Sequence, residues 1–146
     1  YSDATIKIFD ARSLLLKFVI LAHTNSVFTL RYSPDGQTLF SGSRDARLKT
    51  WSATNGYALK QEVVAHLFAI NHLTFSPDWR WLVSASMDKS IKVWNPDDLR
   101  LLKVIDRARH AGHGTSVNKL LWTSHENQLL SASDDRTVSV WRVEEA

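Results

Sequence analysis

Histidine, serine and aspartate recur together in this chain in a fixed order, and these residue types can do chemistry. The three sets are His23, Ser41 or Ser43, and Asp45; His66, Ser84 or Ser86, and Asp88; and His113, Ser131 or Ser133, and Asp135. A hydrolase needs a nucleophile, a base and an acid that orients the base, so each set has the composition of a catalytic triad. An enzyme needs one such set at one cleft, however, and the threefold repetition argues against catalysis.

A tryptophan closes each set, at Trp51, Trp94 and Trp141. Nucleophilic chemistry does not require an indole, but a buried indole N–H needs a hydrogen-bond acceptor. An aspartate can hold the imidazole and a hydroxyl can act as a bridge, and each such bond contributes about 1 kcal/mol. We therefore predict three structural networks and no catalytic residue. The sequence leaves open which serine of each pair takes part.

A metal site is the second chemical reading, because His110 and His113 lie three residues apart beside Arg107 and Arg109. Zinc takes three or four ligands in proteins, the chain has no cysteine, and His113 already belongs to a repeated set. The five glycines are scattered singly, so the chain has no glycine-rich phosphate loop. We predict neither a metal nor another cofactor.

The elements that must position these residues are themselves repeated. The segment from Ser43 to Trp51 recurs at 86–94 and 133–141, and a partial copy ending in Phe9 opens the chain at Ser2. Successive equivalent aspartates, beginning at Asp3, are 42, 43 and 47 residues apart. Periods of about 40 to 45 residues with strand patterning are typical of propeller blades.

One complete repeat predicts four strands. Residues 27–32, 38–43, 48–51 and 57–64 are β-rich, and turn residues separate them, including Pro34, Gly36 and Asn55-Gly56. Consecutive hairpins pair antiparallel, so each repeat makes one small four-stranded sheet. Such a sheet cannot bury both faces alone, and radial stacking of several sheets buries them. The predicted fold class is all-β, a partial β-propeller of about three blades.

Composition fits this class and limits others. The chain has 146 residues, 44% of them apolar, and a net charge of +3 spread along the sequence. The absence of cysteine excludes disulfides and thiolate chemistry. No window approaches the roughly 18 apolar residues that span a bilayer, because the strongest run, 14–22, is interrupted by Lys17. We predict no membrane association.

The repeats resemble the WD40 family over essentially the whole chain. That family places a His in the loop before the first strand, Ser or Thr in the second strand, Asp in the following turn and Trp in the third strand. The sequence departs from the family at the name-giving Trp-Asp pair, which is here Trp51-Ser52, Trp94-Asn95 and Trp141-Arg142. Residues 22–30 and 108–119 further resemble the carboxy-terminal half of stand-alone bacterial seven-bladed members.

The resemblance implies a division into blades. We expect residues 1–21 to end a truncated blade, 22–64 and 65–105 to be complete blades, and 106–146 to be a last blade without its outer strand. Thirteen strands are too few for a closed ring, and open sheets expose apolar faces and unpaired edges. We therefore expect a fragment of a seven-bladed protein. Copies could also associate, with residues 14–21 of one chain pairing at Trp141 of another.

The functional prediction is a noncatalytic scaffold that binds other proteins through the loop face of the propeller. In the family this face carries the loop before the first strand and the turn after the second. With the enlarged polar loop at 106–112, it would present Arg44, Arg47, Phe68, Met87, Lys89, Arg107, Arg109, His110 and Arg136. The alternative is a nucleic-acid-binding propeller that uses the basic members of this set.

Trp79 stands where the first repeat has Gly36, and is expected to be partly exposed on the opposite face. By analogy with the family, the expected location is cytoplasmic.

Overall fold

The computed structural model describes residues 3–144 and shows an all-β chain, as predicted. Ser2, which opens the partial first copy, and the last two residues of the expected last blade lie outside the described residues. The strands are β1 (Thr5–Phe9), β2 (Leu16–Leu21), β3 (Val27–Tyr32), β4 (Thr38–Ser43), β5 (Arg47–Ser52), β6 (Ala58–Val64), β7 (Ile70–Phe75), β8 (Leu82–Ser86), β9 (Ile91–Trp94), β10 (Leu101–Ile105), β11 (Val117–Thr123), β12 (Gln128–Ser133) and β13 (Val138–Arg142).

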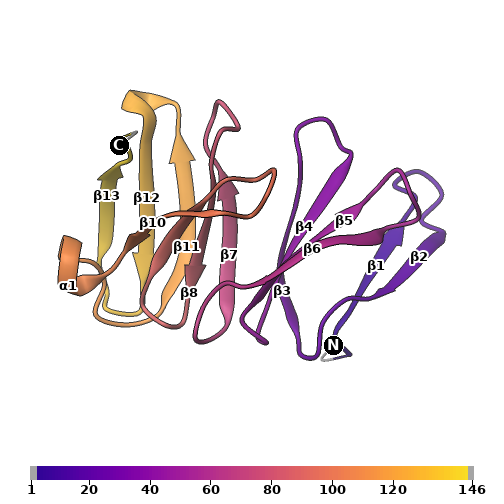
Figure 1. Ribbon diagram of the computed structural model, residues 1–146, viewed down its shortest axis with the longest axis horizontal. Helices are drawn as coiled ribbons and strands as arrows, with labels where there is room; N and C mark the ends of the chain where they lie inside the picture. Colours follow the sequence, from indigo (N-terminus) through magenta and orange to yellow (C-terminus); the bar gives the residue numbers. More distant parts are fainter. Residues whose placement is uncertain (1–2, 145–146) are drawn as a thin grey trace.

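The strands form four antiparallel sheets in chain order. β3–β6 and β7–β10 are four-stranded, β11–β13 is three-stranded, and β1–β2 is a pair. The sheets lie side by side in an open arrangement, with the first and last sheets at opposite ends of the molecule (Figure 1). They do not close into a ring. Blade-like sheets are therefore confirmed, and the first and last sheets each have an outward face.

The same irregularity recurs where the first two strands of a sheet pair. The register shifts between Val27 and Thr29, between Ile70 and His72, and between Val117 and Lys119. One extra residue in a strand makes a bulge, which bends the strand and increases its twist. Equivalent bulges give β3, β7 and β11 the same bend, so these inner strands can lie next to one another.

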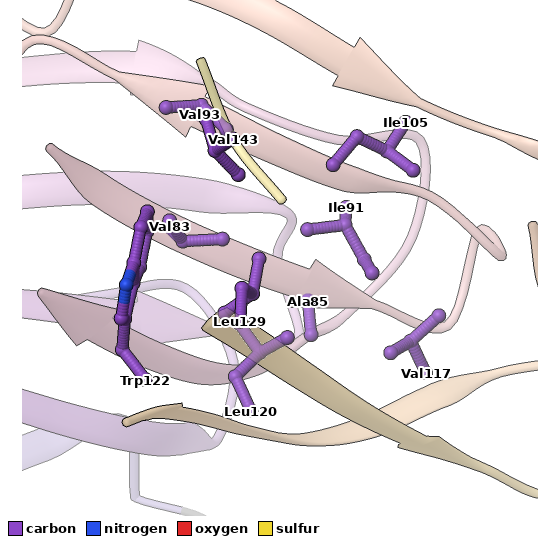
Figure 2. Packing of buried hydrophobic residues seen from close by; sticks show 10 residues of the cluster. All are labelled: Val83, Ala85, Ile91, Val93, Ile105, Val117, Leu120, Trp122, Leu129 and Val143. Carbon is purple, nitrogen blue, oxygen red and sulfur yellow. The ribbon is translucent and has the colours of Figure 1, made fainter. Parts of the chain in front are cut away.

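Apolar side chains fill the space between successive sheets in three clusters. The first joins β1–β2 to β3–β6 through Ile6, Ile20 and Leu39, and the second joins β3–β6 to β7–β10. The third lies between β7–β10 and β11–β13, where Trp122 stands beside Val83 (Figure 2). Fully burying one such side chain contributes about 1.5–3 kcal/mol, so stacking is the main force that joins the sheets.

Polar side chains also join neighbouring inner strands. The hydroxyl of Thr29 accepts the backbone N–H of Leu73 at 3.2 Å, and Nδ1 of His72 accepts that of Leu120 at 3.0 Å. These bonds are equivalent, because Thr29 and His72 hold the same place in successive repeats. Arg31 adds a bond from its Nε to the carbonyl of Leu73 at 3.0 Å.

The enlarged segment at 106–112 forms a single helical turn, α1 (Arg107–His110), where the sequence predicted a loop. Asp106 caps it by accepting the backbone N–H of Arg109 at 2.9 Å, and Ala111 ends it in a left-handed conformation. A short 3₁₀ turn, η1 (His125–Asn127), connects β11 to β12. Within residues 3–144, no helix is long and apolar enough to cross a membrane.

Candidate functional site

Each of the three sheets from β3 onward holds one His–Ser–Asp–Trp network. In the first, Nδ1 of His23 lies 2.9 Å from Oδ2 of Asp45, and its Nε2 lies 2.7 Å from Oγ of Ser41. The indole N–H of Trp51 donates to the same Oγ at 2.9 Å. The network thus ties the loop before β3 to β4, β5 and the turn between them.

The other two networks repeat this geometry. The distances from His66 to Asp88 and to Ser84 are again 2.9 and 2.7 Å, and those from His113 to Asp135 and to Ser131 are the same. Trp94 donates to Ser84 at 2.9 Å, and Trp141 donates to Ser131 at 2.8 Å. The structure therefore places Ser41, Ser84 and Ser131 in the networks.

The second serine of each pair holds the turn instead. Ser43 donates to the carbonyl of Asn25 at 3.1 Å and accepts the backbone N–H of Asp45 at 3.1 Å. Ser86 makes the equivalent bonds to Phe68 and Asp88 at 3.3 and 3.0 Å. These serines link the loop before the first strand to the turn after the second.

The hydrogen-bond pattern defines the tautomer of the first two histidines. A serine hydroxyl that accepts the indole N–H can donate its own proton to Nε2, which leaves Nδ1 to donate to the carboxylate. Burial lowers the pKa of His23 and of His66, although the neighbouring carboxylates act in the opposite direction. Burial raises the pKa of Asp45, but backbone N–H bonds from Arg47 and Thr24 outweigh it and lower that pKa. In these two networks the resting pair is a neutral imidazole beside a carboxylate.

Nucleophilic catalysis would need an accessible serine, and these serines are not accessible. Ser41 and Ser84 are 0% exposed and Ser131 is 1% exposed. Each hydroxyl also accepts an indole N–H, which holds the oxygen in place. The distances are those of a triad, but no substrate can reach the oxygen.

The networks place loops and turns on one surface, which we call the loop face. Arg44 donates its backbone N–H to the carbonyl of Ser26 at 2.9 Å, and Met87 donates to that of Ala69 at 3.0 Å. The turn after β4 or β8 thus lies against the loop before β3 or β7. Of the predicted contact residues, the exposed ones are Arg44, Phe68, Met87, Lys89, Arg107, Arg109, His110 and Arg136.

An apolar cluster stands in the middle of the loop face. Phe68 is 59% exposed and Met87 is 48% exposed. Leu67, which the sequence analysis did not single out, is 82% exposed while its backbone N–H donates to Asp88 at 3.1 Å. Its position directly after the network histidine, in the loop before β7, could have identified it, because such loops run over the protein surface. We call Leu67, Phe68 and Met87 the apolar loop cluster.

The basic residues of the loop face differ in their surroundings. Arg47 is partly buried and ion-paired with Glu62 in β6, so the structure separates it from the exposed members. Nη1 of Arg109 lies 3.7 Å from Oδ2 of Asp106. Arg107 extends toward Gly114 beside the third network and lines an open hollow of about 610 Å³ with Asp135.

The two histidines of the metal hypothesis are not arranged as ligands. Both ring nitrogens of His113 have partners in its network, and His110 is exposed on α1. Within residues 3–144, no three His, Cys, Asp or Glu side chains gather closely enough to hold an ion.

Comparison with known proteins gives the same repeats. The family model for the WD domain, G-beta repeat, matches residues 15–52, 58–95 and 105–142, which together exceed half of the chain. The three matched segments begin just before β2, at the start of β6 and at the end of β10, and each closes with the third strand of the next sheet.

Two curated proteins share parts of this chain. A stretch of 35 residues, 24% of this chain and 4% of the relative, is 46% identical to the periodic tryptophan protein 2 homolog of Dictyostelium discoideum. A stretch of 55 residues, 38% of this chain and 13% of the relative, is 33% identical to the 26S proteasome regulatory subunit RPN14 of Saccharomyces cerevisiae. The chain therefore matches only a small part of each relative's length. On its three matched repeats and their stacked antiparallel sheets, this chain belongs to the WD40 (WD domain, G-beta repeat) family.

Proposed function

We propose that this chain is a noncatalytic platform that binds other proteins through its loop face. The observation that carries the proposal is the threefold network, which buries Ser41, Ser84 and Ser131 and fixes the loops around them. A rigid scaffold with exposed loops is a common way to present a binding surface. The role of the His, Ser, Asp and Trp side chains is then structural.

The apolar loop cluster is the proposed anchor of this surface. Aromatic residues, methionine and arginine are enriched at protein interfaces, and the residues that contribute most to affinity lie centrally. Phe68 and Met87 stand in the middle blade, and Arg44 and Arg136 lie on the turns of its two neighbours. The surface therefore combines an apolar centre with a basic surround, which fits an acidic protein surface with an apolar projection.

Introduction of a negative charge into the apolar loop cluster tests this proposal. Proteins bound to the wild-type chain are compared by quantitative mass spectrometry with those bound to Phe68→Asp and Met87→Asp. The matched control is Leu59→Asp, which places the same charge on an outer strand at a residue that is 51% exposed. We expect the first two variants to lose partners that the control keeps. Equal retention by all variants would contradict binding through the loop face.

The same assay addresses nucleic acid. A nucleic-acid partner would be retained through Arg44, Lys89, Arg107, Arg109 and Arg136, with affinity that falls steeply as salt displaces phosphate contacts. Retention that survives Phe68→Asp, falls with salt and is abolished by nuclease would identify that alternative.

We also propose that residues 22–64 and 65–105 are complete blades, and that residues 1–21 and 106–146 belong to blades which other strands complete. In the complete sheets the outer strand pairs with β5 or β9, whereas the equivalent edge of β13 has no partner within residues 3–144. Further blades of a longer protein, or a second copy of the chain, would supply that strand. The cytoplasmic location remains a prediction from the family resemblance.

A further inference from the structure

The turn between β7 and β8 places a tryptophan in a backbone conformation that favours glycine. Trp79 has φ of 62°, and the equivalent positions hold Gly36 at 70° in the preceding sheet and Glu126 at 49° in the following one. Glycine adopts the left-handed region without steric cost, whereas a residue with a side chain there costs roughly 1–2 kcal/mol. Other turn residues of this chain share such a φ, among them Tyr57 at 58° and Leu99 at 53°, so what distinguishes this turn from that at Gly36 is the large aromatic side chain that it carries.

The Trp79 side chain is placed to make contact with another molecule. It is 45% exposed and packs on Phe75 with ring centroids 5.0 Å apart and planes at 48°. Its turn lies at the end of the sheets opposite α1, away from the loop face (Figure 1). A ligand bound here would therefore not compete for the loop face.

Trp79 separates two hollows. We call the larger one, of about 540 Å³, the aromatic groove; Arg31, Tyr32, Thr74, Phe75, Ser76, Pro77, Trp79, Trp122 and Ser124 line it. The smaller hollow, of about 230 Å³, lies on the other side of Trp79 and includes Lys60 and Asp97. Tyr32 is 42% exposed and its hydroxyl bonds to that of Tyr57 at 2.7 Å, which holds the ring in place. Two exposed, fixed aromatic rings thus border the aromatic groove.

The charge of the aromatic groove is positive. Among its lining residues within the described chain, Arg31 is the charged one, and no carboxylate joins it. The bond from Nε of Arg31 to Leu73 orients the guanidinium and leaves its terminal nitrogens for another partner. An oriented guanidinium accommodates a carboxylate with two parallel hydrogen bonds.

We propose that the aromatic groove binds an acidic peptide segment of a partner protein. A carboxylate of that segment pairs with Arg31, and an adjacent apolar side chain packs between Tyr32 and Trp79. Burial of an aromatic anchor beside a desolvated charge pair is the arrangement that gives a small interface its affinity. The inference is independent of the loop face, because the two surfaces share no residue.

Substitution of Trp79 allows a test in which loss of binding is distinguished from loss of folding. Trp79→Gly removes the aromatic anchor while it places at this φ the residue that position 36 already uses. Arg31→Gln removes the charge from the aromatic groove, and Lys60→Gln removes a charge from the smaller hollow as the matched control. Thermal unfolding of each variant, followed by circular dichroism, establishes that the fold is retained.

The full chain is titrated with a positional library of short acetylated peptides, and affinities are measured by fluorescence polarisation. We expect selection of Asp or Glu next to a large apolar residue, with binding at least about tenfold weaker in Trp79→Gly and Arg31→Gln and unchanged in Lys60→Gln. Selection of basic peptides, absence of any selection, or binding that survives Trp79→Gly would overturn the proposal. Loss of binding in Lys60→Gln alone would assign the ligand to the smaller hollow and overturn it as well.

Discussion

At the scale of single residues, His72 couples the contact between two sheets to pH. Its Nδ1 accepts the backbone N–H of Leu120, so the bond requires an unprotonated nitrogen. Burial, with smaller effects from the Lys119 and Arg31 cations, lowers its pKa to about 4. Unfolded histidine has a pKa near 6.5, so the unfolded state binds a proton first as pH falls. The stabilisation is complete above pH 6.5 and is lost as pH falls toward 4.

Replacement of His72 by threonine should remove this dependence. Thr29 makes the equivalent bond through a hydroxyl, so His72→Thr keeps an acceptor and loses the titrating group. One proton contributes at most about 1.4 kcal/mol per pH unit, and partial exposure reduces this. Urea unfolding at pH 7, 6 and 5 should show a smaller pH slope in His72→Thr than in the wild type. His23 and His66 titrate in the same direction in both proteins and cancel in the comparison. Equal slopes would show that protonation of Nδ1 of His72 does not weaken the folded state.

Removal of one network serine should lower the free energy of unfolding by more than the small size of its side chain suggests. Ser84→Ala leaves both Nε2 of His66 and the indole N–H of Trp94 without their buried partner. An unsatisfied buried polar group costs about 1–3 kcal/mol, so we expect a loss of that order in the free energy of unfolding. The control, Ser124→Ala, changes an exposed serine and should alter it by less than about 0.5 kcal/mol. A similar effect of both changes would refute a structural role for the network.

At the scale of the elements, one glycine sets how closely β4 approaches β7. A Cβ at Gly42 would lie 2.7 Å from Cγ2 of Ile70 and 2.8 Å from Cγ2 of Thr29. The equivalent position in the next sheet is Ala85, so the repeat does not require glycine at this place. The two four-stranded sheets are therefore packed more closely here than an alanine allows.

Gly42→Ala should destabilise the chain by overpacking. Added methyl groups in a filled core typically cost about 1–3 kcal/mol, and chemical unfolding measures the loss directly. Because part of the clash is with Cγ2 of Ile70, the double variant Gly42→Ala/Ile70→Ala should lose less than the sum of the two single variants. Strict additivity would place the origin of the loss at Thr29 or in the backbone of β4 instead.

At the scale of the whole molecule, the two outer sheets expose apolar faces. Leu121, Val138 and Val140 are 61%, 64% and 57% exposed on the last sheet, and Val19 and Leu21 are 51% and 86% exposed on the first. In a propeller such faces lie between blades. The faces between the inner sheets of this molecule are filled by the clusters described above.

The chain purified alone should therefore associate with copies of itself. Light scattering over a dilution series should give a mass above that of one chain. Val138→Lys together with Val140→Lys should return it to one chain, because the charges oppose burial of that face. A wild-type monomer at all concentrations would show that an open set of sheets is stable in solution.

Much of this structure could be predicted from the sequence, because its signals are local and repeated. Alternating apolar residues predicted the strands, and the fixed spacing of His66, Asp88 and Trp94 placed them in one blade. Because His, Ser, Asp and Trp side chains donate or accept hydrogen bonds, a shared network among them could also be predicted. The helical turn α1 was predicted as a loop because four residues are too short to produce helical periodicity.

Only the tertiary structure decided the rest, since it depends on distances between segments that sequence spacing does not give. Ser41 and Ser43 lie on the same side of one strand, and only the former lies level with the indole of Trp51. The His72 bond to Leu120, the close approach at Gly42 and the aromatic groove beside Trp79 all lie between neighbouring sheets. The sequence by itself determined the repeat and its chemistry, whereas the stacking of sheets determined which atoms meet.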